Sequence, residues 1–377
     1  MITSNTLLSH SIKRKISTEM DDWLRIDPNK ASRDTLNMYR SNSKLIDELF
    51  PKTGERLEFG TAGLRAAFGP GYLRMNEVVV MQTSLGLLRQ LEADFGRKAI
   101  QENGIVIGYD HRCSKEWGLS SKGFALAAAC VFLAEGYEKI YLFDKLNPTP
   151  FVPFAIQHFK CLAGFMMTAS HNPKQDAGFK VYWNNACQIV APVDELVSKK
   201  ILENLILNPK SVEFLNAGEK GIFTKLSNYS NGLCDVIKRE YIQQSTSKFC
   251  RSKLENNRFT KKICYTAMHG VGSDFVISLF EAFGHQPLVI VPSQAEPDYE
   301  FSTVKFPNPE EKGALDLAIK HAEQFYSNLV ISTDPDADRL GVAEYDPILK
   351  SWYIFTGDEI AMLSTIRSPR QKPSASS

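Results

Sequence analysis

One stretch of the sequence, TASHNPKQDAGFK at residues 168–180, could handle a phosphoryl group. Ser170 and His171 follow directly after an apolar run, and Lys180 comes ten residues after the serine. Pro173 pushes the residue before it toward an extended conformation, so the Ser170 hydroxyl is expected at a loop tip. A serine needs a neighbouring base to act as a nucleophile, and His171 and Lys180 are candidates. The spacing fits a plain polar surface turn equally well.

A second stretch, STDPDADRLG, places Asp334, Asp336 and Asp338 at alternate positions. In an extended loop, alternation puts the three carboxylates on one side. They repel one another unless a cation neutralises them, and ligands that are all oxygen suit magnesium or calcium. A calcium EF-hand needs glycine where Arg339 stands and glutamate where Tyr345 stands, so the sequence excludes that motif. The alternative is a solvated acidic turn.

A third stretch, FGTAGLRAAFGPG at residues 59–71, combines several glycines with Arg65. Glycine allows the backbone to approach a ligand closely, and the arginine fork suits a phosphate. The stretch is not a P-loop, because no Gly-Lys-Ser/Thr follows. A glycine-rich turn without a ligand remains open here. The HGVG turn at residues 269–272 is a weaker signal, which strand-to-helix packing would also explain.

Two series of apolar runs alternate with helical patterns and would position these loops. Alternation of strands and helices predicts parallel pairing, and ligands of such sheets gather at the carboxyl ends of the strands, where Asp110–Arg112 and Ser170 lie. The first series has predicted strands at 104–110, 139–143 and 161–168 with helices at 120–136 and 151–159. The second has predicted strands at 261–268, 287–291 and 328–333 with helices at 273–284 and 313–325.

The domain organisation follows from the gap between these series. The stretches 207–214 and 216–223 are rich in turn residues and place a boundary near residue 215. We therefore expect a disordered tail at 1–20, a first domain at 21–215, a second at 216–350, and the start of a third followed by a disordered tail at 351–377. We find no usable internal repeat.

Composition excludes several classes of protein. The formal net charge is +1, which favours neither nucleic acid nor an anionic membrane as a partner. No segment approaches the roughly 20 apolar residues of a membrane span. Seven scattered cysteines without a CxxC pair indicate reduced thiols, and hence a cytoplasmic protein. The acid-poor start of the chain leaves a mitochondrial presequence as the alternative to a polar tail.

Together the motifs resemble the α-D-phosphohexomutase superfamily. TASHNP and DPDADR occur in the order typical of that superfamily, with a glycine and a lysine after the first. FGTAGLR, PTPFVPF, KVYW and PNPEE are similar to the eukaryotic branch of phosphopentomutases and glucose-1,6-bisphosphate synthases. The similarity covers roughly residues 20–362.

The resemblance implies roles for individual residues. Ser170 would be the phosphoserine that carries the transferred group. His171 and Lys180 match the positions of acid–base and phosphate-contacting groups. Arg339 would lie beside the phosphate, and Arg65 would contact it from the glycine-rich loop.

The resemblance also implies a metal site and a reaction. Asp334, Asp336 and Asp338 would hold Mg²⁺ together with the phosphate on Ser170. The implied reaction is a magnesium-dependent phosphosugar mutase acting on pentose 1-phosphate or glucose 1-phosphate through a sugar bisphosphate. The implied partners are small phosphosugars and sugar bisphosphates, and the implied state is a monomer.

The resemblance predicts two consecutive α/β sandwich domains with mixed, mostly parallel sheets. Superfamily members have four domains, and we expect the third and fourth to be missing, so that this chain is a truncated form with little or no turnover. The alternatives are a non-catalytic magnesium-binding remnant or regulatory isoform, and a small-molecule phosphatase that uses the same half-site.

Overall fold

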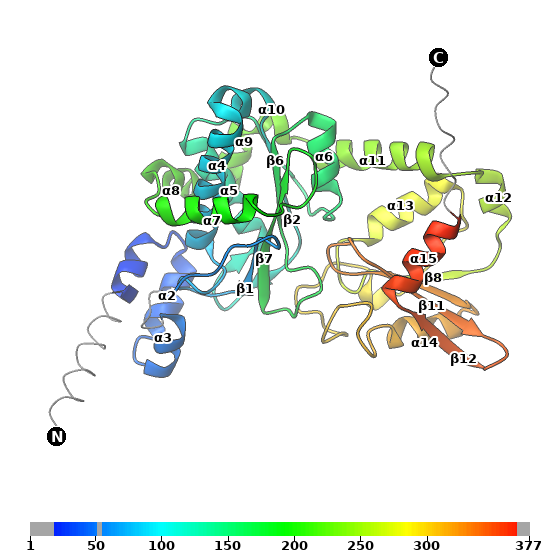
Figure 1. Cartoon of the computed structure of the whole chain (residues 1–377). Coiled ribbons are helices and arrows are strands. Elements are labelled where there is room, and N and C mark those ends of the chain that lie inside the picture. The colour runs from blue at the N-terminus through cyan, green and yellow to red at the C-terminus, as the bar shows by residue number, and fades with distance from the viewer. Residues whose placement is uncertain (1–18, 51–54, 368–377) are drawn as a thin grey trace, which may run out of the picture.

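The structure, a computed structural model, describes residues 19–50 and 55–367 as two α/β units (Figure 1). The long helix α11 (Leu233–Phe249) runs between the two units. Most of the tail predicted at 1–20 and of the tail predicted at the C-terminus lies outside the described residues. Residues 19–26 form a helix that precedes α2.

The first unit is built on a five-stranded sheet in the order β1-β7-β6-β2-β5. Strand β2 pairs in parallel with β5 and β6, whereas β7 is antiparallel to both of its neighbours. Helix α6 covers one face of this sheet, and α4, α5, α7 and α8 lie on the other side (Figure 1). The strands are β1 (Leu64–Ala67), β2 (Ile105–Tyr109), β5 (Ile140–Leu142), β6 (Ala163–Met167) and β7 (Asp176–Trp183), with a small hairpin of β3 (Cys113–Ser114) and β4 (Leu119–Ser120). The helices are α2 (Lys30–Met38), α3 (Ser43–Leu49), α4 (Glu77–Asn103), α5 (Ser121–Ala134), α6 (Phe151–Phe159), α7 (Val193–Glu203), α8 (Pro209–Asn216), α9 (Gly218–Lys225) and α10 (Ser227–Ser230).

The second unit repeats this arrangement with the order β12-β11-β10-β8-β9. Strand β8 pairs in parallel with β9 and β10, and β11 is antiparallel to both of its neighbours. The two sheets therefore share one pairing scheme, in which β2 corresponds to β8 and β6 to β10, a repeat that the sequence does not reveal. The elements are α12 (Lys253–Arg258), β8 (Ile263–Thr266), α13 (Ser273–Phe283), β9 (Val289–Ile290), the 3₁₀ turn η1 (Pro292–Gln294), α14 (Asp316–Gln324), β10 (Leu329–Thr333), β11 (Leu340–Asp346), β12 (Ser351–Phe355) and α15 (Gly357–Arg367).

The predicted fold class is confirmed: both units are α/β with mixed sheets. Parallel pairing makes up half of the strand pairs in each sheet rather than most of them, because the antiparallel strands β1, β7, β11 and β12 complete the sheets. A long loop connects β9 to α14, interrupted by the short η1 turn.

The region expected to be turn-rich, residues 207–223, instead contains the helices α8 and α9. The Asn208 side chain accepts the N–H of Lys210 and caps α8, and Pro209 occupies the first turn, where a proline is tolerated. Gly218, the first residue of α9, has φ +75° and so breaks the continuity of the two helices. The turn residues here mark helix ends rather than a linker.

The core of the first unit extends beyond residue 215. Ile222, Leu226, Leu233 and Ile237 are buried in it. We therefore propose that the first domain continues into α11.

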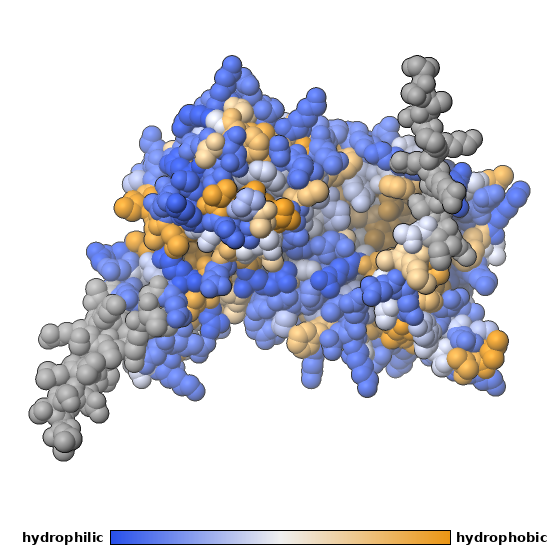
Figure 2. Space-filling model, viewed as in Figure 1, coloured by the Kyte–Doolittle hydropathy of each residue, from blue (hydrophilic) through white to orange (hydrophobic). Residues whose placement is uncertain are grey.

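Apolar side chains are exposed at the far end of the second unit. Ile348 and Leu349, in the turn between β11 and β12, are 89% and 73% exposed, and Tyr353 on β12 is 51% exposed. Figure 2 shows a hydrophobic patch at this end of the molecule. The buried core of the second unit is smaller than that of the first and consists mainly of small side chains, among them Cys264 on β8, Val330 on β10 and Ala318 on α14.

Two structural findings concern the membrane span and the cysteines considered in the sequence analysis. Among the described residues, none of the helices has the length and apolar character that a membrane crossing requires. All seven cysteines are described, and each is a free thiol.

A buried carboxylate at the start of α4 predicts a pH-dependent stability. Glu77 is 6% exposed, its Oε1 accepts a hydrogen bond from Asn29 at 2.9 Å, and its Oε2 is buried without a protein partner. Burial raises the pKa of Glu77 from 4.5 to about 7, against the Asn29 hydrogen bond, which lowers it. The folded chain therefore holds this proton more tightly than the unfolded chain does.

We expect the stabilisation from protonated Glu77 to be complete below pH 4.5 and lost by about pH 7, a loss of about 3 kcal/mol. Urea unfolding from pH 4.5 to 8 should show this decline, and the Glu77→Gln variant should lack that part of it. Equal pH slopes for the two proteins would contradict the assignment.

Candidate active site

The serine loop connects β6 to β7 and holds Ser170 in a left-handed conformation. Ser170 has φ +54°, and its N–H donates to the Thr168 hydroxyl at 2.8 Å. The Asn172 N–H donates to the Ala169 carbonyl at 3.0 Å and closes the turn. The sequence predicts this hydroxyl at a loop tip. In the structure that loop tip is covered by the second unit, so Ser170 is only 2% exposed.

The aspartate loop follows β10 at the corresponding place in the second sheet. Asp334 comes directly after the strand, and its Oδ1 accepts the N–H groups of Asp338 and Arg339, both at 3.1 Å. Its own carbonyl accepts the N–H of Ala337, which has φ +57°. One oxygen from each of Asp334, Asp336 and Asp338 lies within 4.8 Å of the others, so the loop gathers the three carboxylates as predicted.

The HGVG turn supports this loop from behind. A Cβ on Gly270 would lie 2.3 Å from the Cα of Pro335, so only glycine lets the two backbones approach so closely. The Val271 N–H also donates to the Pro335 carbonyl at 2.9 Å. This turn therefore packs against the backbone of the aspartate loop, whereas the sequence predicted strand-to-helix packing as the alternative to a ligand.

The two loops meet across the contact between the units. The Ser170 hydroxyl donates to Asp334 Oδ2 at 2.8 Å. Lys180 on β7 places its ammonium 2.7 Å from Asp336 Oδ2 and 2.6 Å from Asp338 Oδ2. The structure thus brings the serine, the lysine and the three aspartates into one site.

Thr149 also belongs to this site, although spacing alone does not single it out. Its hydroxyl donates to Asp336 Oδ2 at 2.5 Å, and its N–H donates to the Asp336 carbonyl at 2.8 Å. It stands in the NPTP turn before α6, and the PTPFVPF motif is the only sequence signal that includes it.

The aspartates differ in their pKa values because their surroundings differ. Burial and the charges of the two neighbouring carboxylates raise the pKa of Asp334 well above its ordinary range. Burial would also raise the pKa of Asp336, but the charge of Lys180 and hydrogen bonds from Lys180 and Thr149 outweigh it and lower the pKa. Burial opposes the charged form of Lys180, and the Asp336 and Asp338 carboxylates still raise its pKa. Both partners of the Lys180–Asp336 ion pair are therefore charged at neutral pH.

His171 lies beside the hydroxyl as a neutral imidazole. Its Nδ1 is 3.2 Å from Ser170 Oγ. Burial lowers its pKa to about 4, and the positive charges of Arg339 and Arg65 contribute further. At neutral pH the ring can therefore accept a proton.

The two predicted arginines lie at the rim of the site. Arg65 on β1 is exposed and donates to the Asn172 side chain at 3.1 Å, which ties the glycine-rich loop to the serine loop. A Cβ on Gly63 would lie 1.8 Å from the Phe179 carbonyl oxygen, so this glycine lets β1 pack against β7. Arg339 follows the aspartates and is exposed.

The donor set suits a hard divalent cation. The three carboxylates offer only oxygen ligands, and Asp336 Oδ1 is buried without a hydrogen-bond partner. Burying a carboxylate oxygen without a partner is costly, and a cation would satisfy it. The Ser170 hydroxyl is hydrogen-bonded to Asp334, so a phosphate attached to Ser170 would add an oxygen to this set of ligands.

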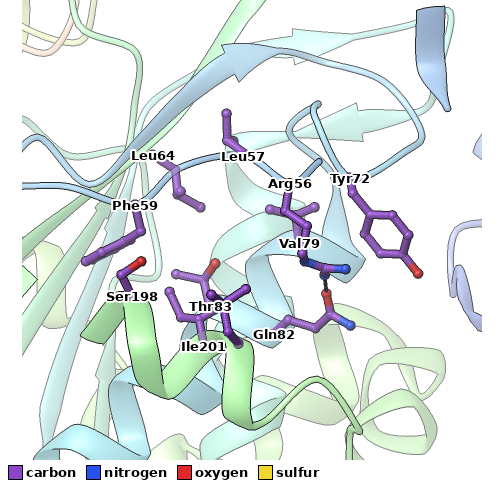
Figure 3. A pocket seen from close by; sticks show the side chains of 11 residues that line it. Arg56, Leu57, Phe59, Leu64, Tyr72, Val79, Gln82, Thr83, Ser198 and Ile201 are labelled. Atoms are coloured by element: carbon purple, nitrogen blue, oxygen red, sulfur yellow. Dashed lines mark hydrogen bonds between the residues drawn. The ribbon is translucent and has the colours of Figure 1, made fainter. Parts of the chain in front are cut away.

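A separate pocket lies on the first unit, between the chain that leads into β1 and the helices α4 and α7 (Figure 3). Its volume of about 30 Å³ is room for about one water molecule. Arg56 donates to the Gln82 side chain at its edge, as Figure 3 shows. None of the residues that line this pocket belongs to the site between the units.

A serine hydroxyl next to a neutral imidazole, clustered carboxylates and flanking arginines lie together where the two α/β units meet. Two family models match the chain: phosphoglucomutase/phosphomannomutase α/β/α domain I over residues 56–205 and domain II over residues 239–346. The chain belongs to the phosphoglucomutase/phosphomannomutase family of the α-D-phosphohexomutase superfamily, and the predicted resemblance is confirmed.

Known proteins show the same relationship. Human phosphopentomutase is 41% identical over 350 residues, which are 93% of this chain and 55% of the relative. Human glucose 1,6-bisphosphate synthase is 38% identical over 358 residues, which are 94% of this chain and 55% of the relative. The chain therefore spans about half the length of these relatives.

The fold is shared with a solved structure. The crystal structure of a putative phosphomannomutase from Thermus thermophilus superimposes with a TM-score of 0.58 at 21% identity. The match covers 78% of this chain and 59% of that one.

Proposed function

We propose that this chain carries the phosphoryl-accepting, metal-binding part of a phosphosugar mutase. The observation that carries the proposal is the 2.8 Å contact between the Ser170 hydroxyl and Asp334, which joins the serine loop to the three-aspartate group. The similarity to phosphopentomutase and glucose 1,6-bisphosphate synthase supports a pentose or hexose phosphate as substrate.

In the proposed reaction, Ser170 Oγ attacks the phosphorus of a sugar bisphosphate, and the bond from that phosphorus to the sugar oxygen breaks. The hydroxyl proton passes to Nδ1 of the neutral His171, 3.2 Å away, and the departing sugar oxygen takes up a proton from water, to which His171 then returns its own. The products are phosphoserine and a sugar monophosphate. Reversal with the other end of the sugar completes an intramolecular transfer.

The remaining residues hold and neutralise the phosphoryl group, which is the main demand of this chemistry. Asp334, Asp336 and Asp338 would hold Mg²⁺, which when bound neutralises negative charge on the transferred group. Arg65 and Arg339 supply further positive charge at the rim, and Lys180 pairs with Asp336 and Asp338 while no metal is bound. We further propose that the protein acts as a monomer in the cytoplasm.

The direct experiment mixes the chain with glucose 1,6-bisphosphate or ribose 1,5-bisphosphate and follows its intact mass, with and without Mg²⁺. We expect one phosphate per chain with Mg²⁺ and far slower incorporation after chelation with EDTA. An unmodified mass with both sugars in the presence of Mg²⁺ would favour a protein that binds the metal without accepting the phosphoryl group.

A further inference from the structure

Arg112 lies beneath the serine loop with its side chain fully buried. Its guanidinium donates to four carbonyl oxygens of the loop: those of Ser170 at 2.5 Å, Asn172 at 2.7 Å, Pro173 at 2.8 Å and Asp176 at 3.1 Å. The loop therefore turns the negative ends of several peptide groups toward one cation. Hydrogen bonds to a charged donor are about twice as strong as neutral ones.

The cation is paired and covered. Asp110 Oδ2 lies 3.5 Å from Arg112 Nε, and Asp110 Oδ1 accepts the Arg112 N–H and the Ser121 hydroxyl. The ring of Phe301, from the second unit, lies 5.0 Å from the guanidinium carbon and is itself buried. A buried charge with these partners is held in one place, because losing any of them leaves it desolvated and uncompensated.

This network accounts for the unusual backbone of Ser170. A left-handed conformation is strained for a residue other than glycine and persists only where the surroundings enforce it. Thr168 holds the Ser170 N–H and Arg112 holds the Ser170 carbonyl, so both sides of the residue are fixed. Because the peptide is planar, fixing the carbonyl also turns the N–H of His171 away from the guanidinium.

We propose that Arg112 is a positioning residue that holds the serine loop in the conformation that presents the Ser170 hydroxyl to Asp334, and that Phe301 extends this control to the second unit. Arg112 acts through the backbone of the loop. Its effect on phosphoryl transfer rests on the proposed function, whereas its effect on the loop does not.

The test compares Arg112→Lys and Phe301→Leu with the parent chain and with Arg89→Lys as a control. Arg89 pairs with Glu92 and Glu135 in the same unit, so its replacement perturbs an arginine network that does not involve the serine loop. Hydrogen exchange of residues 168–178 and the rate of Ser170 phosphorylation by glucose 1,6-bisphosphate with Mg²⁺ are measured for each protein.

For Arg112→Lys we expect exchange in the loop to quicken by at least about tenfold, because a lysine cannot satisfy the carbonyls with a fork. Phosphorylation at saturating bisphosphate should slow by about 100-fold, since a small displacement of a reacting group has an effect of that size. The half-saturating concentration should change by less than about threefold. Phe301→Leu should also quicken the loop exchange and slow phosphorylation, by smaller factors than Arg112→Lys does. Arg89→Lys should change neither the loop exchange nor the rate.

Unchanged loop exchange in folded Arg112→Lys would overturn the proposal. Exchange that rises equally throughout the first unit would also overturn it, because that is the result of a general loss of stability. If Arg112→Lys does not fold, Phe301→Leu decides, and parent-like loop exchange and rate in that variant would refute the idea. If the parent chain takes up no phosphate, the proposed function fails while the exchange comparison still tests the positioning role.

Discussion

Ser170→Ala should take up no phosphate from a sugar bisphosphate. In the parent chain, the Ser170 hydroxyl is the only one in the described site that contacts both His171 and an aspartate of the three-carboxylate group. Removal of a nucleophile typically lowers a rate by several orders of magnitude, and we expect a decrease of at least about 10³-fold. Intact mass followed by peptide mapping measures the effect.

The control for this experiment is Ser114→Ala, which removes a hydroxyl from the β3–β4 hairpin of the same unit. It should be phosphorylated like the parent chain. Phosphate that maps to another residue, or a Ser170→Ala chain that is labelled at the parent rate, would show that Ser170 is not the acceptor.

Asp336→Asn should weaken Mg²⁺ binding by at least about 100-fold. Replacing groups that merely support a metal ligand already weakens binding by about 10- to 100-fold, and Asp336 would be a ligand itself. The amide keeps the shape of the side chain but removes the charge of a fully buried carboxylate. Calorimetric titration with Mg²⁺ measures the affinity, at a temperature where thermal unfolding shows the variant to be folded.

Two further variants separate a metal site from a general effect on folding. Asp235→Asn removes an exposed carboxylate that also pairs with a lysine, Lys145, at 2.7 Å, and should bind Mg²⁺ like the parent chain. Lys180→Met removes the cation that competes for Asp336 and Asp338, and should bind Mg²⁺ more tightly. Folded Asp336→Asn with parent-like affinity would exclude these carboxylates as the site.

The sequence predicts those parts of the site that are local. Three alternating aspartates after a strand are a short-range pattern, and one loop indeed gathers them. Ser170 and Lys180 are likewise placed by the loop and strand that follow β6. The left-handed conformation of Ser170 is not visible in the sequence, because the residue is not a glycine and tertiary contacts impose it.

The contacts between distant segments could not be predicted in this way. Thr149 bonds to Asp336 across 187 positions, and Arg112 bonds to the Ser170 carbonyl across 58 positions, so no spacing rule reaches either pair. The pairing order that the two sheets share could not be predicted from the sequence for a related reason. Strand β1 comes first along the chain among the strands of its sheet, whereas the matching strand β12 comes last in the second sheet, so the matching strands do not follow in the same order along the chain.

The central claim is that Ser170 and the three aspartates form one site for a phosphoryl group and its metal ion. Anomalous diffraction from a crystal of the phosphorylated chain with Mn²⁺ in place of Mg²⁺ tests it most directly. We expect one strong manganese peak in contact with carboxylate oxygens of Asp334, Asp336 and Asp338 and with an oxygen of the Ser170 phosphate. A manganese peak elsewhere, or one that contacts the aspartates while the phosphate lies on a different residue, would contradict it.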